Sequence, residues 1–161
     1  MATIQEILTT RLNNIKSRII RNMTEQKRMA SGRSAASLRV EVQGNHGILW
    51  GAKSFLSMER GRGAGKIPLG FVAIIKQWAI DKGISVSARS KLGKPMSRES
   101  ALNSFAGAVA YSIMKKGTRL HRSRKYDDIF TTVLNEELEK MGEDLNINLL
   151  DKITGINESA E

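Results

Sequence analysis

The pattern of apolar and polar positions predicts one long helix at the start of the chain. The pair Thr3 and Glu6 has the T-x-x-E spacing of a capping box at a helix start. Apolar residues then recur at three- and four-residue spacing, as one face of a helix requires: Ile4, Ile7, Leu8, Leu12, Ile15, Ile19 and Met23. We expect a helix from Thr3 to about Met29 that packs along a sheet. Contact with a partner is the alternative use of its length.

An alternation with a period of two follows and predicts a β-hairpin. Leu38–Gln43 alternates apolar and polar residues, as a half-buried strand does. Residues 44–47 are a cluster of turn-forming residues, and Ile48–Trp50 is predicted to be the returning strand. A short helix is expected over Lys53–Arg60.

The middle of the chain joins a glycine-rich basic loop to an amphipathic helix. Arg60–Lys66 has the sequence RGRGAGK, which combines cations with very small residues. A helix is predicted over Leu69–Lys82, with Pro68 in its first turn and Gly83 at its C-terminal cap. Its predicted apolar face consists of Phe71, Ile74, Ile75, Trp78 and Ala79.

Two further helices are predicted in the second half of the chain. The first has Ser97 as its N-cap, runs to Lys116 and stops at Gly117. A polar, basic loop is expected before it, at 85–95. The second helix is predicted from Thr131 or Thr132 to about Gly142, with a break there and an extension over 145–153.

These elements together predict an α+β fold. We expect a small antiparallel sheet, the hairpin near 38–50, packed by several helices, with a long N-terminal helix. The length of 161 residues favours a single domain. Within it we distinguish an N-terminal helix (1–30), an α+β core with basic loops (31–125) and an acidic helical C-terminal region (126–161). Four large aromatic side chains are expected to anchor the core: Trp50, Phe71, Trp78 and Phe105.

Charge is distributed unevenly along the chain, which has a net charge of +10. Residues 1–125 contain 24 Lys and Arg against 6 Asp and Glu, whereas residues 126–161 contain 2 against 10. Such asymmetry indicates two different neighbours, or association of a basic surface with an acidic one. A basic domain with a solubilising acidic tail is the simpler alternative.

Composition argues against several classes of function. The chain has no cysteine, which excludes disulfides, thiolate metal sites and cysteine nucleophiles. His46 and His121 lie far apart in sequence, so we expect no metal site and no cofactor. No apolar run approaches the length of about 20 residues that a membrane span needs. The N-terminal sequence carries Glu6 and lacks a continuous apolar stretch, so we expect no signal peptide and synthesis in a cytoplasm.

The glycine-rich loop is the main candidate for binding. It is not a Walker A motif, because Arg60 stands where the first glycine is needed and Ile67 follows Lys66 in place of Ser or Thr. Arg60, Arg62 and Lys66, together with exposed glycine N–H groups, suit the phosphates of a nucleic acid. Insertion against a neighbouring subunit suits the same residues equally well.

A second basic run, from Lys115 to Lys125, contains no acidic residue. Its cations are Lys115, Lys116, Arg119, Arg122, Arg124 and Lys125. We find no pattern of paired carboxylates and no nucleophile with a local base, so we expect no enzymatic activity.

Several short motifs in a fixed order resemble those of one protein family. In chain order they are SGR at 31–33, ERGRG-x-GK-x-P at 59–68, I-x-x-W-x-x-x-KGI at 75–84 and A-x-A-V-A-x-x-I-x-x-x-GT at 106–118. This ordered set resembles the small neck proteins of tailed bacteriophages, the head–tail connector and tail-completion group. The acidic region after Tyr126 lies outside the resemblance.

The resemblance implies a structural protein of the virion. Proteins of this group form homo-oligomeric rings at the portal vertex, around the passage that the genome takes, and have no enzymatic activity. Their partners are the portal and the neighbouring neck or tail proteins. On this interpretation the two basic stretches face either the DNA passage, with non-specific DNA contact, or the adjoining ring. A basic nucleic-acid-binding protein outside a virion is the alternative.

Overall fold

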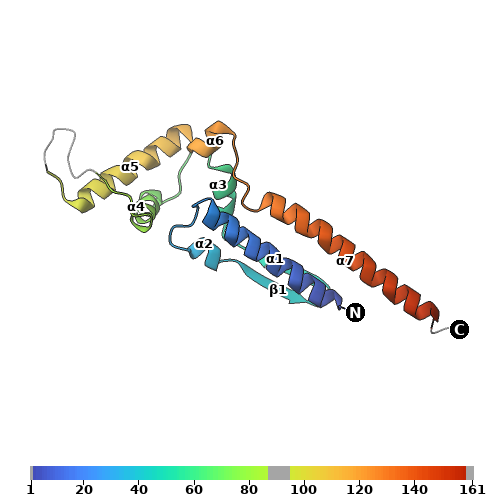
Figure 1. Cartoon of the computed structure of the whole chain (residues 1–161). Helices are drawn as coiled ribbons and strands as arrows, with labels where there is room; N and C mark the ends of the chain where they lie inside the picture. The colour runs from blue at the N-terminus through green and yellow to red at the C-terminus, as the bar shows by residue number, and fades with distance from the viewer. Residues whose placement is uncertain (1, 87–94, 159–161) are drawn as a thin grey trace. The chain divides into compact units, whose positions relative to one another are not determined.

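The computed structural model describes residues 2–86 and 95–158, and the fold is α+β (Figure 1). The basic loop predicted at 85–95 falls largely on residues 87–94, outside the described residues. Contacts within the chain divide it into two compact units. Unit 1 consists of Met1–Met29, Ser34–Phe55 and Asp128–Glu161, and unit 2 of Ala30–Arg33 and Leu56–Asp127.

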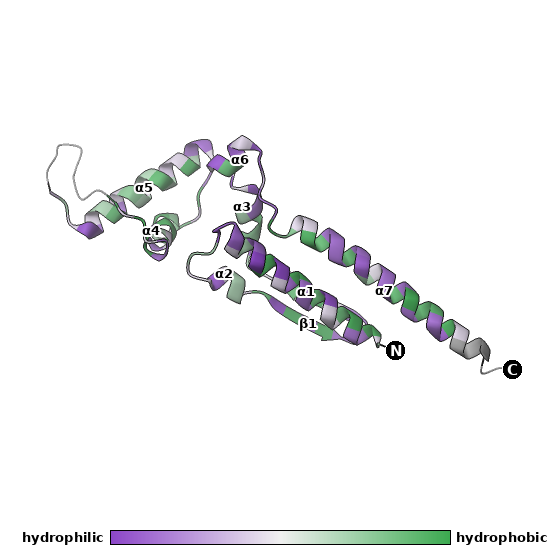
Figure 2. Ribbon diagram, viewed as in Figure 1, coloured by the Kyte–Doolittle hydropathy of each residue, from purple (hydrophilic) through white to green (hydrophobic). Residues whose placement is uncertain are grey.

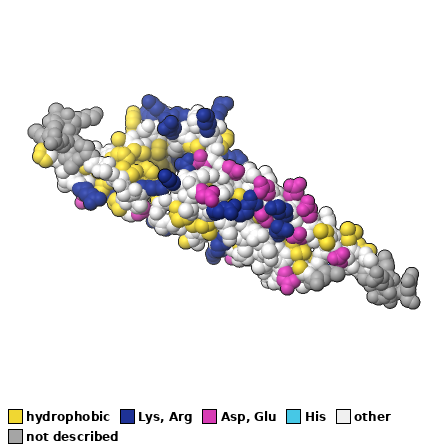
Figure 3. All heavy atoms as spheres, viewed as in Figure 1, with side chains coloured by type: hydrophobic (Ala, Val, Ile, Leu, Met, Phe, Trp, Pro, Cys, Tyr) yellow, Lys and Arg dark blue, Asp and Glu magenta, His cyan; other side chains and the backbone are white. Residues whose placement is uncertain are grey.

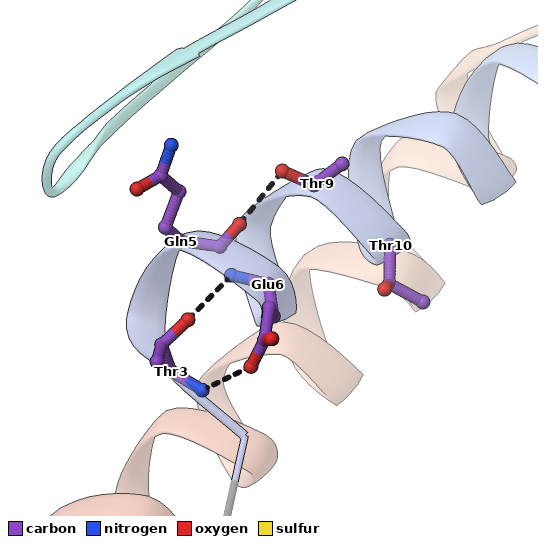
Figure 4. A pocket seen from close by; sticks show the side chains of 5 residues that line it. All are labelled: Thr3, Gln5, Glu6, Thr9 and Thr10. Carbon is purple, nitrogen blue, oxygen red and sulfur yellow. Dashed lines mark hydrogen bonds between the residues drawn. The ribbon is translucent and has the colours of Figure 1, made fainter.

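Unit 1 is built around the long N-terminal helix, α1 (Ile4–Glu25). The predicted capping box is present: the Thr3 hydroxyl accepts from the Glu6 N–H, and the Glu6 carboxylate accepts from the Thr3 N–H (Figure 4). The predicted apolar face is the buried face, from Ile7 to Met23. The helix ends four residues earlier than expected, and Figure 2 shows hydrophobic and hydrophilic residues alternating along it.

The predicted hairpin packs against α1. Strand β1 (Arg39–Gln43) pairs antiparallel with β2 (His46–Trp50), and Gln43 lies opposite His46. The turn is therefore only two residues long, and Gly44 adopts the left-handed φ of +58° that such a turn favours. The hairpin approaches α1 closely because Gly47 has no side chain: a Cβ there would lie 2.6 Å from the Leu12 side chain.

The C-terminal helix α7 (Thr131–Glu158) runs antiparallel to α1 in unit 1. The Asn22 amide donates to the Ile129 carbonyl, and the Asn148 amide donates to the Ala2 carbonyl at the opposite end. The predicted break at Gly142 is wrong, since α7 is continuous through it. Glycine costs a helix interior only about 1 kcal/mol, and α1 holds the flanking turns through buried Met141 and the ion pair of Asp144.

Ion pairs join the basic side of α1 to the acidic side of α7. The side chain of Glu137 is only 5% exposed and accepts from Arg18 at 2.9 Å and from Arg11 at 3.4 Å. Arg11 also binds Asp144 at 2.7 Å, and Arg18 binds Glu136. Figure 3 shows blue and magenta side chains intermingled there. Part of the C-terminal acidity thus neutralises the N-terminal helix of the same chain.

Unit 2 is formed by helices. Helix α3 (Ser54–Arg60) contains the boundary between the units, and α4 (Phe71–Asp81) packs against α5 (Arg98–Lys116). The caps predicted for α5 are confirmed: the Ser97 side chain accepts from the Ser100 N–H, and Gly117 is the C-cap. Helix α6 (Arg119–Ser123) was not predicted; it begins after Thr118, whose hydroxyl accepts from the His121 N–H.

Helix α4 is shorter and more exposed than the sequence indicates. It begins at Phe71, so Pro68 lies outside it, although Gly83 does adopt the predicted left-handed conformation after its C-terminus. Of the predicted apolar face only Ala79 is buried, because α5 covers the side of the helix on which Ala79 lies.

The aromatic residues expected to anchor the core do not do so. Trp50 is 47% exposed and Trp78 is 40% exposed, while Phe71 and Phe105 are only partly buried. The core consists instead of aliphatic side chains in unit 1, with Phe55, and of small alanines with Leu102 in unit 2. The hairpin also groups with α1 and α7 in unit 1, whereas the sequence-based division placed it with the basic loops.

Acid should weaken the contact between α1 and α7. Burial raises the pKa of Glu137, but hydrogen bonds from Arg18 and Arg11 outweigh it and leave this pKa below the usual 4.5. A lowered pKa in the folded chain means that the paired carboxylate stabilises the fold above about pH 4.5, and that this contribution is lost as the pH falls through the lowered pKa.

We therefore expect Glu137→Gln to reduce the free energy of unfolding at pH 7 by about 2 kcal/mol and to flatten its dependence on acid. Urea unfolding at pH 7 and at lower pH measures both effects. Glu139→Gln, on the same helix but exposed and without an ion pair in the described residues, is the matched control and should change little. Equal loss in both variants would contradict the assignment.

Candidate macromolecule-contact surface

The two basic stretches singled out in the sequence meet in unit 2. The Arg62 N–H donates to the Thr118 hydroxyl at 2.9 Å, and the Thr118 N–H donates back to the Arg62 carbonyl at 2.8 Å. One turn away, the Gly65 N–H donates to the Met114 carbonyl at 2.8 Å. The glycine-rich loop is thus bound along the end of α5 and the start of α6 by its own backbone.

Glycine is required at this contact because backbone lies against backbone. Gly117 is buried, has a φ of +72°, and a Cβ on it would lie 2.7 Å from the Arg62 carbonyl oxygen. Gly61 has a φ of +74°, and a Cβ there would lie 2.5 Å from the His121 nitrogen. Real Cβ atoms do not approach so closely, so any side chain at either position would separate the two segments.

The docked loop differs from the exposed, glycine-lined loop expected from the sequence. The N–H groups of Gly61 and Gly65 are already hydrogen-bonded, to the carbonyls of Ser57 and Met114, and cannot bind phosphate. Arg62 is half-buried: its guanidinium donates to the Lys66 carbonyl at 2.7 Å and lies 5.4 Å from the centre of the Phe71 ring. Arg62 therefore braces the loop against α4, whereas the side chains of Arg60 and Lys66 are exposed.

Docking gathers the exposed cations of both stretches at one end of unit 2. We call this group the basic cluster, and Figure 3 shows such blue side chains over α6 and the end of α5. Its members are Arg60, Lys66, Lys115, Lys116, Arg119, Arg122, Arg124 and Lys125. They come from sequence segments that contain no Asp or Glu between Arg60 and Lys66 or between Lys115 and Lys125.

Local structure fixes the direction of several of these cations. Lys115 and Lys116 end α5, where positive charge is favourable for the helix dipole. Lys115 also lies 5.8 Å from the Tyr111 ring centre, and Arg122 donates to the Gly117 carbonyl at 3.2 Å. The cluster therefore offers partly oriented charges and hydrogen-bond donors, which is what phosphate or carboxylate groups of a macromolecule would bind.

The sequence identified these residues but not their proximity. Nothing in either segment alone indicates that 62 and 118 are neighbours. The signal that could have found the contact is the pair Gly61 and Gly117, one within each basic stretch, since close backbone approach is one of the few reasons for glycine there.

A shallow hollow beside the α1 N-terminus is lined by Thr3, Gln5, Glu6, Thr9 and Thr10 (Figure 4). Its polar groups largely form hydrogen bonds within the helix itself; the Thr9 hydroxyl, for example, donates to the Gln5 carbonyl. Among residues 2–86 and 95–158 there is no cluster of His, Asp and Glu able to hold a metal ion, and no helix is long and apolar enough to span a bilayer.

Comparison with known proteins gives no assignment: no family model, no curated protein and no solved structure matches this chain. The chemistry of the basic cluster and the sequence motifs are therefore the basis for any functional proposal.

Replacing Gly117 should undo the docking of the loop. We expect Gly117→Ala to destabilise unit 2 by about 2–3 kcal/mol, because it combines a strained φ with a clash against the Arg62 carbonyl. Urea unfolding measures the loss, and hydrogen exchange of the Gly65 amide reports the undocking directly. Gly107→Ala is the matched control, since nothing lies within 4 Å of its added Cβ and it sits inside α5. It should stabilise by about 0.5–1 kcal/mol; a neutral Gly117→Ala would contradict the docked geometry.

Proposed function

We propose that the chain is a structural subunit of a tailed-bacteriophage virion, a neck or tail ring protein that joins the portal vertex to the tail around the DNA passage. It would act by binding other macromolecules and catalyse no reaction. Its proposed partners are other copies of itself, the portal and the adjoining neck or tail proteins. It would be made in the host cytoplasm and end in the virion.

One observation carries the proposal: two motifs of the phage-like set, ERGRG-x-GK at 59–66 and the GT at 117–118, bind each other through their backbones. Their glycines are explained by that contact, and their cations are displayed by it. The glycines thus allow the close backbone contact that presents the basic surface. Such a surface suits either encapsidated DNA or an acidic face of an adjoining protein.

A second candidate function, nucleic-acid binding outside a virion, is favoured by the basic cluster alone. Eight exposed cations on one end of a unit are enough for appreciable non-specific affinity for duplex DNA. The two candidates differ in what they require of the isolated chain. A ring subunit must associate with other copies of itself, whereas a free nucleic-acid-binding protein needs only its basic surface.

For the ring proposal, we expect the purified chain to form a closed assembly, either alone at high concentration or on isolated portal particles. Sedimentation gives its mass, and electron microscopy shows whether the particles are annular. In a phage that encodes this chain, a nonsense mutation in its gene should give heads that fail to join tails or to retain DNA. Normal, DNA-filled, tailed particles without the protein would refute the proposal.

For the nucleic-acid alternative, filter binding to duplex DNA across a salt series is decisive. Tight binding by the monomer with a steep salt dependence would support it, with each neutralised phosphate contributing about −0.9 to the slope of log K against log salt. In that case Lys116→Ala should reduce the slope by about one such contribution. Lys53→Ala, an exposed lysine of unit 1 outside the cluster, should leave it unchanged. Weak, salt-insensitive binding would eliminate this alternative.

A further inference from the structure

Helix α7 has a second apolar face besides the one that packs on α1. Leu138, Leu149 and Ile153 are 52%, 49% and 56% exposed, and together with half-buried Leu145 they recur at spacings of seven, four and four. At 3.6 residues per turn this spacing places all four on one side of the helix. We call them the α7 stripe. Gly142 lies within it, with nothing within 4 Å of an added Cβ, so another helix could approach closely there.

The end of the α7 stripe extends beyond its support in unit 1. The Asn148 amide binds the Ala2 carbonyl, where α1 begins, so residues 149–158 continue past the N-terminus of α1. Figure 3 shows yellow side chains near this end. A short apolar helical segment is only marginally stable in water without a packing partner, so this segment suits a partner outside unit 1.

The acidic residues of α7 indicate the charge of that partner. Glu136, Glu137 and Asp144 face α1 and are paired with Arg18 and Arg11. Glu139 and Glu143 are exposed and form no ion pair within the described residues, and Glu139 is the one that lies beside the α7 stripe. A partner surface for this side of α7 should therefore be apolar in its centre and positively charged at its border.

Helix α4 of this same chain has a surface of that kind. Ile74 is 57% exposed and Trp78 is 40% exposed. The two lie four residues apart on one side of α4, and half-buried Phe71 lies on the same side. Arg62 lies over the Phe71 ring, and its guanidinium binds the carbonyl of Lys66, whose side chain is exposed. We call Phe71, Ile74, Trp78 and these two cations the α4 face.

The acid on α4 and an acid paired with an α4 lysine are both in ion pairs. Asp81, three residues after Trp78, pairs with Arg33 at 3.3 Å, and Glu99 pairs with Lys76 at 3.1 Å. Neither Arg62 nor Lys66 has a carboxylate partner within the described residues. The α4 face thus carries net positive charge around an aromatic and aliphatic centre.

We infer that the partner is a second copy of this chain, in which the α7 stripe of one copy packs on the α4 face of the next. The two faces are complementary in charge and both are apolar. Because they are different surfaces, the contact is heterologous, which builds rings or filaments instead of a symmetric dimer. This inference rests on the proposed ring function and names the contact that would close the ring.

Engineered cysteines test the contact between copies, since the chain has none of its own. A tagged chain carrying Leu149→Cys is mixed with an untagged chain carrying Ile74→Cys, under mild oxidation. Only contact between copies can join the two, and we expect a mixed disulfide at least about tenfold more abundant than in the control, because the contact raises the local thiol concentration. The control pair, Ile147→Cys with Ile80→Cys, has similar exposure on the other sides of the same helices.

A charge placed in the α7 stripe gives a second test that does not need cysteines. Leu149→Asp should weaken self-association by about tenfold or more, as loss of a central interface side chain does, whereas Ile147→Asp should not; circular dichroism checks that both remain folded. If assemblies form but the 149–74 disulfide is not enriched and Leu149→Asp has no effect, this inference is overturned. The ring proposal then still stands. A chain that stays monomeric at every concentration and on portal particles would overturn both.

Discussion

The arrangement of unit 2 depends on one close approach of two backbone segments, the glycine-rich loop at 61–65 and the joint of α5 and α6 at 114–118. Hydrogen bonds between Arg62 and Thr118 hold it, and Gly117 makes it sterically accessible. Everything proposed for the basic cluster follows from this contact, because it converts two separate basic stretches into one surface. Arg62, which the sequence suggests as a contact residue, also braces the loop, because its guanidinium binds the Lys66 carbonyl and lies over the Phe71 ring.

Charge is used differently in the two units. In unit 1, the arginines of α1 meet the carboxylates of α7 at a half-buried contact, so opposite charges of the same chain neutralise each other. In unit 2, the cations of the basic cluster come from segments without acids and point outward. The uneven charge of the sequence therefore has two origins, an internal contact and an external surface. The prediction of a separate acidic region describes the composition correctly but misses that α7 is a full partner of α1.

The elements that could be predicted from the sequence are those defined by local chemistry. The capping box at Thr3, the hairpin, the cap at Ser97 and the stop at Gly117 each depend on a few adjacent residues. Contacts between distant segments could not be predicted, and they decide the remaining features. Packing against α1 carries α7 through Gly142, and the bond between 62 and 118 joins the basic stretches. The tryptophans are a related case: an apolar periodicity predicts which side chains share a face but does not show whether that face is buried.

Closure of unit 1 by the last helix also decides when that unit can form. Arg11 and Asp144 are 133 positions apart in the chain, and contacts at such separation are slow to form because a long loop must close first. Unit 2 consists almost entirely of the contiguous segment Leu56–Asp127. Most of unit 2 therefore precedes α7 in the chain, and unit 1 cannot close until α7 has been synthesised.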